Sequence, residues 1–184
     1  MQAAQSSRFS WLLITLHWVV LLLVIGVYAT IELHDAFPKG SAGRAALTSW
    51  HSMLGVSVLG LAAVRLLVRA FSPAPAIDPA PPRWQATAAT LTHIALYALM
   101  FVLPLTGWLM FNADGKELMW FGAQLPTLVA PSKPLAHTIK EVHEVLANLG
   151  YGLIGLHAAA ALFHHYVMRD NTLQLMWPRL RPVR

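Results

Sequence analysis

The sequence contains no cysteine among its 184 residues. This absence excludes disulfides, iron–sulfur clusters, zinc sites with cysteine ligands and haem attached through thioether bonds. Charged residues are also scarce, at 11% of the chain, whereas a soluble domain carries about 25%. Hydrophobic residues make up 57% of the chain. The composition therefore predicts a membrane protein rather than a soluble domain.

The formal net charge is +5, and the basic residues lie mostly at the ends of apolar runs. A nucleic-acid-binding module needs a basic face on a soluble domain, so we expect no nucleic-acid partner. Charges that flank apolar runs are instead typical of residues that set the topology of a membrane protein.

Four apolar stretches are long enough to cross a bilayer, which takes about 20 residues as a helix. Five prolines make residues 72–83 an extended connector, and residues 112–140 form the longest segment outside the spans. The predicted fold is an all-α, integral-membrane bundle of four transmembrane helices in a single domain, 1–184. The spans are expected at about residues 10–31, 47–68, 88–111 and 142–167.

Lysine and arginine predict how the bundle is oriented. Eight of them fall on one side of the four spans and five on the other, so the first side is expected to be cytoplasmic, with both termini on it. The first set is Arg8, Arg65, Arg69, Arg83, Arg169, Arg179, Arg181 and Arg184. The second set is Lys39, Arg44, Lys116, Lys133 and Lys140.

Of the nine histidines, four lie at depths in the first, second and fourth spans that can be compared: His17, His51, His143 and His157. Ionisable residues inside a span are costly and usually functional. His143 and His157 are fourteen residues apart, which places them on one helix face and about 21 Å apart along the axis. By depth alone, His17 pairs with His157 near the inner surface and His51 pairs with His143 near the outer surface.

Each pair supplies two imidazoles from different helices at one level. Neutral imidazole is a good iron ligand and carries no charge into lipid. The pattern therefore predicts two b-type haems, each ligated on both faces and suited to electron transfer. The alternatives are interhelical hydrogen bonds and a divalent metal. The zincin pattern H-E-x-x-H fails because Ala147 replaces its second histidine.

Gly150 lies midway between His143 and His157 on the same helix stripe. Because glycine lets a bulky ring approach the backbone, we interpret Gly150 as a haem-packing position. Glycine is also common in membrane helices.

Several segments resemble the prokaryotic cytochrome b561 family of four-helix, di-haem membrane proteins. They are LHW at residues 16–18, Trp50-His51 and HEVLANLGYGLIGLHAAAALFHHYVMRDNTL at residues 143–173. The resemblance covers about residues 6–177 and is strongest to small stand-alone members, including superoxide oxidases. It implies haem-iron ligands at His17, His51, His143 and His157, quinone chemistry, a periplasmic donor and a bacterial inner membrane.

The resemblance also makes His164 the first choice for a ubiquinone contact, because a histidine can hydrogen-bond a quinone carbonyl and supply a proton. His93, on the inner side of the third span, is a weaker quinone candidate. Either could be an ordinary interfacial or interhelical residue. Candidates for pairing with haem propionates are Arg8, Arg44, Arg65 and Arg69.

The lysines at 116, 133 and 140 could attract an anionic donor such as superoxide. Because acidic residues lie beside them, ordinary loop solvation is the better interpretation from sequence alone.

The predicted function is electron transfer from a small periplasmic donor, with superoxide suggested by the resemblance, to ubiquinone. The alternative is a haem b anchor and electron-relay subunit of a periplasmic dehydrogenase or hydrogenase. The sequence leaves open whether the chain has a protein partner.

Overall fold

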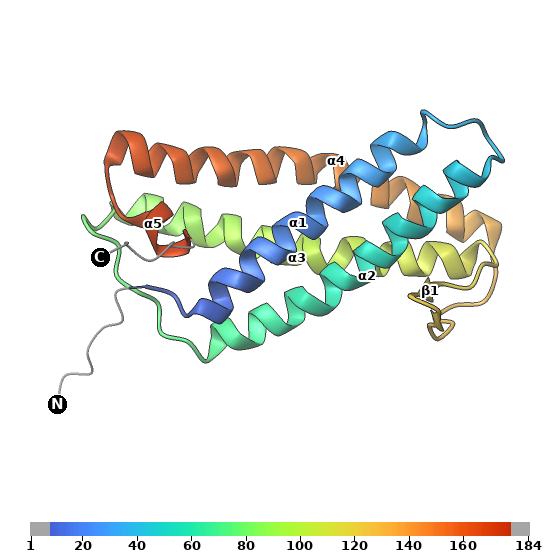
Figure 1. Cartoon of the computed structure of the whole chain (residues 1–184), viewed down its shortest axis with the longest axis horizontal. Helices are drawn as coiled ribbons and strands as arrows, with labels where there is room; N and C mark the ends of the chain where they lie inside the picture. Colours follow the sequence, from blue (N-terminus) through green and yellow to red (C-terminus); the bar gives the residue numbers. More distant parts are fainter. Residues whose placement is uncertain (1–7, 178–184) are drawn as a thin grey trace, which may run out of the picture.

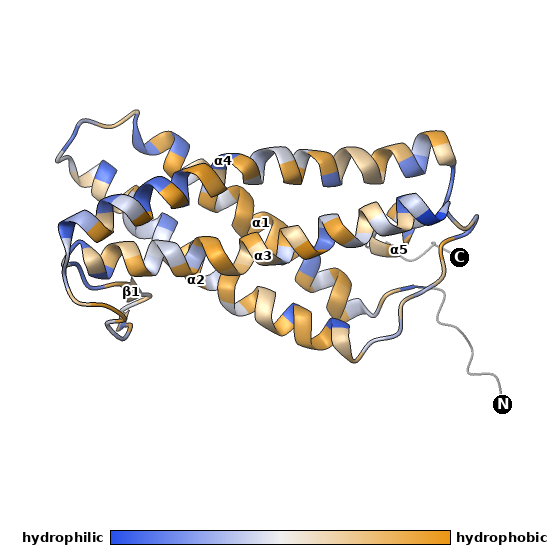
Figure 2. Cartoon of the chain, turned by 180° about the vertical axis from the view of Figure 1, so that it is seen from behind, coloured by the Kyte–Doolittle hydropathy of each residue, from blue (hydrophilic) through white to orange (hydrophobic). Residues whose placement is uncertain are grey.

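The structure is a computed structural model that describes residues 8–177 of the chain. Four long helices run alternately in opposite directions (Figure 1). All four are long and apolar enough to cross a membrane, and Figure 2 shows mostly hydrophobic residues along their middle parts. The predicted all-α, four-helix membrane fold is therefore confirmed. The helices are α1 (Trp11–His34), α2 (Ala42–Ala70), α3 (Arg83–Ala113) and α4 (Lys133–Phe163).

Serine side chains fix the starts of the first two helices. Ser10 Oγ accepts a hydrogen bond from the backbone N–H of Leu13, and Ser41 Oγ accepts one from Arg44. Each bond satisfies a donor that the first turn would otherwise leave unpaired. At α4 the start is favoured by Pro134 in the first turn, where a missing N–H costs nothing.

The helices pack closely as the pairs α1–α2, α3–α4 and α2–α3. Among the described residues, α4 has no comparably close backbone packing with α1 or α2. The fully buried Leu13 and Ala62 belong to the α1–α2 pair. The α1–α2 pair and the α3–α4 pair are thus separated by a space, and side chains of α4 meet those of α1 and α2 across it.

A short hairpin follows α3 at the end of the bundle that holds His51 and His143, which is called the outer end after the predicted orientation. Its strands, β1 (Met119–Trp120) and β2 (Ala123–Gln124), are antiparallel with Met119 opposite Gln124. Trp120 Nε1 donates a hydrogen bond to Ser57 Oγ of α2 at 3.1 Å. This bond holds the hairpin against α2. The hairpin was not predicted from the sequence.

At the inner end, α4 passes into a π-helical turn, η1 (His164–Met168), and the chain then reverses at Arg169, which has a left-handed φ of 57°. A short helix, α5 (Thr172–Met176), folds back toward the bundle (Figure 1). Trp18 Nε1 of α1 donates to the Met176 carbonyl at 2.9 Å. This places α5 beside the residue that follows His17.

Each expected span lies within an observed helical segment, apart from Ser10, which precedes α1 as its cap. The helices extend beyond the expected spans, most of all at the fourth. α4 begins at Lys133 rather than near residue 142, so the end of the expected loop 112–140 is helical. His137 is consequently a helix residue, and His34 is the last residue of α1. The connector 72–83 agrees with the prediction, because α2 ends at Ala70 and α3 begins at Arg83.

Three arginines used in the orientation argument lie outside the described residues. They are Arg179, Arg181 and Arg184.

Candidate functional site

The structure brings together both histidine pairs that helix depth predicts. The ring centroids of His17 on α1 and His157 on α4 are 6.3 Å apart, with 68° between the ring planes. Those of His51 on α2 and His143 on α4 are also 6.3 Å apart, with 70° between the planes. Two sites of matching geometry thus lie fourteen residues apart along α4, a rise of about 21 Å.

In the outer pair, His51 is oriented by the backbone of α1. Its Nδ1 lies 3.0 Å from the carbonyl oxygen of Val27. Because a carbonyl only accepts, Nδ1 must carry the proton. The lone pair of His51 is therefore on Nε2, which is the nitrogen left to bind a metal.

His143 is oriented in a similar way, by a side chain of α3. Its Nδ1 lies 3.0 Å from Thr106 Oγ1, and the Thr106 hydroxyl lies 2.9 Å from the carbonyl of Leu103. Since the hydroxyl gives its single proton to Leu103, it must accept the proton of His143 Nδ1. A Cβ on the neighbouring Gly107 would lie 3.4 Å from His143 Cε1, so a small residue suits this approach.

The inner pair lies among basic residues. The ring of His93 on α3 is 5.5 Å from that of His157. Arg65 of α2 is within electrostatic reach of His17, His93 and His157. Its guanidinium donates to the Tyr97 hydroxyl. Its buried Nε has no hydrogen-bond partner among the described residues.

Sequence comparisons agree with this geometry. The family model for prokaryotic cytochrome b561 matches residues 8–179. This chain belongs to the prokaryotic cytochrome b561 family. It is 43% identical to Cytochrome b561 homolog 1 of Escherichia coli (strain K12) over 94% of this chain and 98% of that protein. It is 37% identical to a Yersinia pestis protein named "Probable superoxide oxidase CybB", over 95% and 98% of the two chains.

Membership in the cytochrome b561 family makes the chain a multi-pass membrane electron-transfer protein and implies b-type haem. The residues present fit that group. Two imidazoles that bind one ion through bonds of about 2 Å have ring centroids roughly 6 Å apart, and both pairs have 6.3 Å. The free Nε2 atoms of His51 and His143 are suited to bind an iron. The unpaired Nε of Arg65 is suited to donate to a haem propionate.

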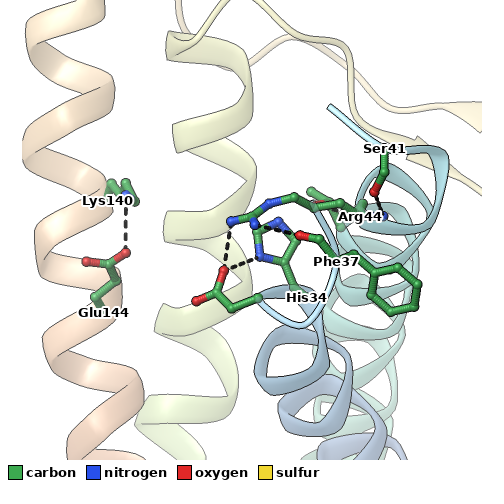
Figure 3. Close-up of polar contacts among 8 residues, drawn as sticks. His34, Phe37, Ser41, Arg44, Lys140 and Glu144 are labelled. Carbon is green, nitrogen blue, oxygen red and sulfur yellow. Dashed lines mark hydrogen bonds and ion pairs between the residues drawn. The ribbon is translucent and has the colours of Figure 1, made fainter. Parts of the chain in front are cut away.

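Arg44 is less available to a propionate. At the outer ends of α1 and α2 it donates to Asp35 Oδ1 at 2.7 Å and to the Phe37 carbonyl at 3.1 Å (Figure 3). Arg69 donates to the Ser72 carbonyl and lies over the ring of Phe9. Of the arginines considered, Arg65 therefore has the clearest relation to a histidine pair.

Gly150 is buried, but its neighbour is a protein side chain. A Cβ there would collide with the Tyr28 hydroxyl, which donates to the Ala147 carbonyl at 2.9 Å. The glycine thus lets a residue of α1 reach the backbone of α4. Haem packing at Gly150 stays a prediction, and the described contact is with Tyr28.

A cavity of about 400 Å³ opens at the outer end of α2, α3 and α4. Lys116 and Lys133 line it and contact Asp114 at 2.8 and 2.7 Å. Their hydrogen bonds lower the pKa of Asp114 to about 2, so the carboxylate is ionised. Lys140 also lines the cavity and pairs with Glu144 at 3.4 Å (Figure 3).

This cavity gathers all three lysines that the sequence suggested were ordinary loop charges. Its lining carries three lysines against one carboxylate, so its net charge is positive. Thr48 and Lys140 also line it, and they precede His51 and His143 by three residues each. The cavity therefore lies close to the outer pair along both helices.

At the inner end, His164 Nδ1 lies 2.5 Å from Asp170 Oδ2. Burial alone would raise the pKa of Asp170, but hydrogen bonds from His164 and Thr172 hold it below its usual range. Asp170 was not predicted from the sequence; its only signal there is its place six residues after His164. Val27 and Thr106 were not predicted either, because their role depends on how the helices are rotated.

Proposed function

We propose that the chain oxidises superoxide at the outer face of the membrane and reduces ubiquinone at the inner face. Two superoxide ions would each lose one electron and leave as oxygen, and ubiquinone would take up two electrons and two protons. The observation that carries the proposal is the pair of histidine sites, equal in spacing and at opposite levels of one bundle.

The chain would hold two b-type haems, whose iron supplies reversible one-electron chemistry when bound. His51 and His143 would ligate the outer iron, and His17 and His157 the inner iron. An iron held by two imidazoles in this way would transfer electrons and would not bind oxygen. The chain's part is to fix the two groups and tune their potentials.

The outer cavity supports an anionic donor. Its three lysines outweigh Asp114, and a positive hollow raises the local concentration and association rate of a small anion. The name of the Yersinia pestis relative, "Probable superoxide oxidase CybB", supports superoxide as that anion. The proposed electron path therefore begins beside Thr48 and Lys140.

The inner end supports a quinone site. His164, the first residue of η1, follows His157 by about two helical turns, which places it about 10.5 Å further along the helix axis. We assign His164 to a quinone carbonyl and keep His93 as a second candidate, because its ring lies beside His157. Gly150 is retained as a haem-packing position between the two sites.

The charge distribution supports placing the outer end in the periplasm and both termini in the cytoplasm of a bacterial inner membrane. In this orientation the cavity opens to the periplasm, so the chain would bind superoxide from that side. Quinone reduction then draws protons from the cytoplasmic side.

A superoxide pulse given to the purified, haem-loaded protein tests the proposal. The haems should be reduced faster than superoxide dismutates, and added ubiquinone should reoxidise them and appear as quinol. Haem reduction by dithionite with no response to superoxide would contradict the proposed donor.

One observation favours the alternative role of a membrane anchor for a periplasmic dehydrogenase. Trp50 and Phe121, whose rings are 6.2 Å apart, are exposed at the outer side with Met119. An exposed apolar patch can bind a partner protein. Purification from native membranes with a stoichiometric periplasmic partner would favour this role.

A further inference from the structure

The turn that ends α4 holds a histidine–carboxylate pair that the haem sites do not use. His164 Nδ1 and Asp170 Oδ2 are 2.5 Å apart, and their side chains are 17% and 2% exposed. A carboxylate this deeply buried is costly unless its oxygens are hydrogen-bonded. The second oxygen, Oδ1, accepts from the backbone N–H of Thr172 at 2.9 Å.

The backbone around the pair is anchored from two directions. The N–H of Asp170 donates to the His164 carbonyl at 3.1 Å, and Arg169 adopts a left-handed conformation. Asn171 then binds the connector between α2 and α3. Its side-chain oxygen accepts from the Asp78 N–H at 3.0 Å, and its own N–H donates to the Asp78 carbonyl at 3.2 Å. These bonds fix where the carboxylate meets the imidazole.

We propose that Asp170 is a positioning residue that keeps the His164 Nδ1 protonated and thereby makes Nε2 the atom that gives protons to a quinone. The inference rests on the proposed function and assigns a proton route to its quinone site. A carboxylate that accepts from Nδ1–H selects one tautomer and stabilises the imidazolium form. The lowered pKa of Asp170 keeps the carboxylate ionised for this role.

As the quinone accepts one electron from the inner site, the Nε2–H bond of the His164 imidazolium breaks and an O–H bond forms at a quinone carbonyl oxygen. The N–H electron pair stays on Nε2. Water at the inner surface reprotonates Nε2, and a second electron with a second proton completes the quinol.

The obvious alternative is that Asp170 only caps the end of α4 through its backbone N–H. Asp170→Asn separates the two roles because the backbone bond is retained. The asparagine amide can instead donate to Nδ1 and so favour the opposite tautomer. Asp78→Asn is the matched control. It makes the same chemical change in the adjoining connector, where the Asp78 side chain is exposed and the bonds to Asn171 use the Asp78 backbone.

The experiment uses the full-length, haem-loaded chain, reduced with dithionite and mixed with a short-chain ubiquinone. General acid catalysis contributes about 10²–10⁴-fold, so we expect Asp170→Asn to slow maximal haem reoxidation at least tenfold, with little change in the quinone concentration giving half the maximal rate. Asp78→Asn should match the parent, and Asp170→Glu should recover part of the loss.

A second readout does not depend on turnover. In ¹⁵N-histidine spectra, the His164 signal, assigned by its loss in His164→Gln, should show a protonated Nδ1 in the parent and an altered tautomer in Asp170→Asn. An Nε2–H tautomer in the parent would overturn the proposal even if Asp170→Asn failed to fold. Haem reoxidation by ubiquinone at the same rate in Asp170→Asn and in the parent would also overturn it. A parent that ubiquinone cannot reoxidise would instead overturn the proposed function itself.

Discussion

The outer and inner histidine pairs share one ring spacing, 6.3 Å, but differ in what surrounds them. In the outer pair both Nδ1 atoms are hydrogen-bonded, to Val27 and Thr106. For His17 and His157 the described residues supply no such bond, and Arg65 and His93 lie nearby instead. The same ligand geometry is therefore placed in two electrostatic environments.

The different surroundings predict which of the two sites has the lower reduction potential. A hydrogen bond from Nδ1 makes imidazole a more basic ligand, which stabilises the oxidised iron. A nearby cation such as Arg65 favours the reduced form, because reduction removes a positive charge. We therefore expect the outer site to have the lower potential and the inner site the higher, so that electrons run inward.

The largest expected effect is the separate loss of each haem. His51→Ala should reduce the haem content from two per chain to one and leave the inner haem, whereas His17→Ala should leave the outer haem. Removing one of two iron ligands abolishes bis-histidine binding at that site only. A pyridine haemochrome assay gives the content, and His34→Ala is the control. Loss of both haems or of neither would refute the pairing.

The second comparison concerns the two ends of the electron path. Replacing Lys116 and Lys133 by Gln should slow haem reduction by superoxide about tenfold at low salt, with a smaller effect at high salt, because electrostatic steering is screened. Stopped-flow absorbance checks this. Reoxidation by ubiquinone should not change.

The matched control for that variant is Lys39→Gln, an outer-side lysine that does not line the cavity. An equal loss in Lys39→Gln would assign the effect to overall charge and not to the cavity.

A smaller effect is expected on the midpoint potential of the inner haem, whose proposed ligands lie near Arg65. In the His51→Ala background, where only the inner haem remains, Arg65→Gln should lower the midpoint potential by about 60 mV, equivalent to roughly 1.4 kcal/mol. Arg83→Gln, an exposed arginine at the start of α3, should leave the potential unchanged. An unchanged potential in Arg65→Gln would show that Arg65 does not raise the potential of the inner haem.

The smallest effect is expected at Thr106. In the His17→Ala background, Thr106→Val removes the acceptor of His143 Nδ1–H and should raise the outer potential by about 30 mV, roughly 0.7 kcal/mol. Thr90→Val changes an exposed α3 residue that bonds only its own helix and serves as control. A fall in the potential would contradict the proposed effect of the hydrogen bond.

The comparison also shows what the sequence could predict. The pairing of His17 with His157 and of His51 with His143 followed from depth, because the rise of a helix per residue is fixed. The bonds from Val27 and Thr106 did not follow, since they depend on how α1 and α3 are rotated against their neighbours. His93 was placed on the correct side, but its closeness to His157 needed the packing of α3 on α4.

The outer cavity could not be predicted for a related reason. Lys116 comes from a loop, and Lys133 and Lys140 come from the first turns of α4, which the hydropathy of the sequence assigned to a loop. Polar first turns carry little apolar signal even when they are helical. Only the folded chain shows that these charges surround one hollow with Asp114.

The central claim is that electrons enter at the outer pair and leave from the inner pair. The most direct test is a superoxide pulse given to the two single-haem variants in the presence of ubiquinone. The His17→Ala protein should still be reduced by superoxide but should form no quinol, whereas the His51→Ala protein should not be reduced at an appreciable rate. Reduction of the His51→Ala protein as fast as the parent would contradict the account.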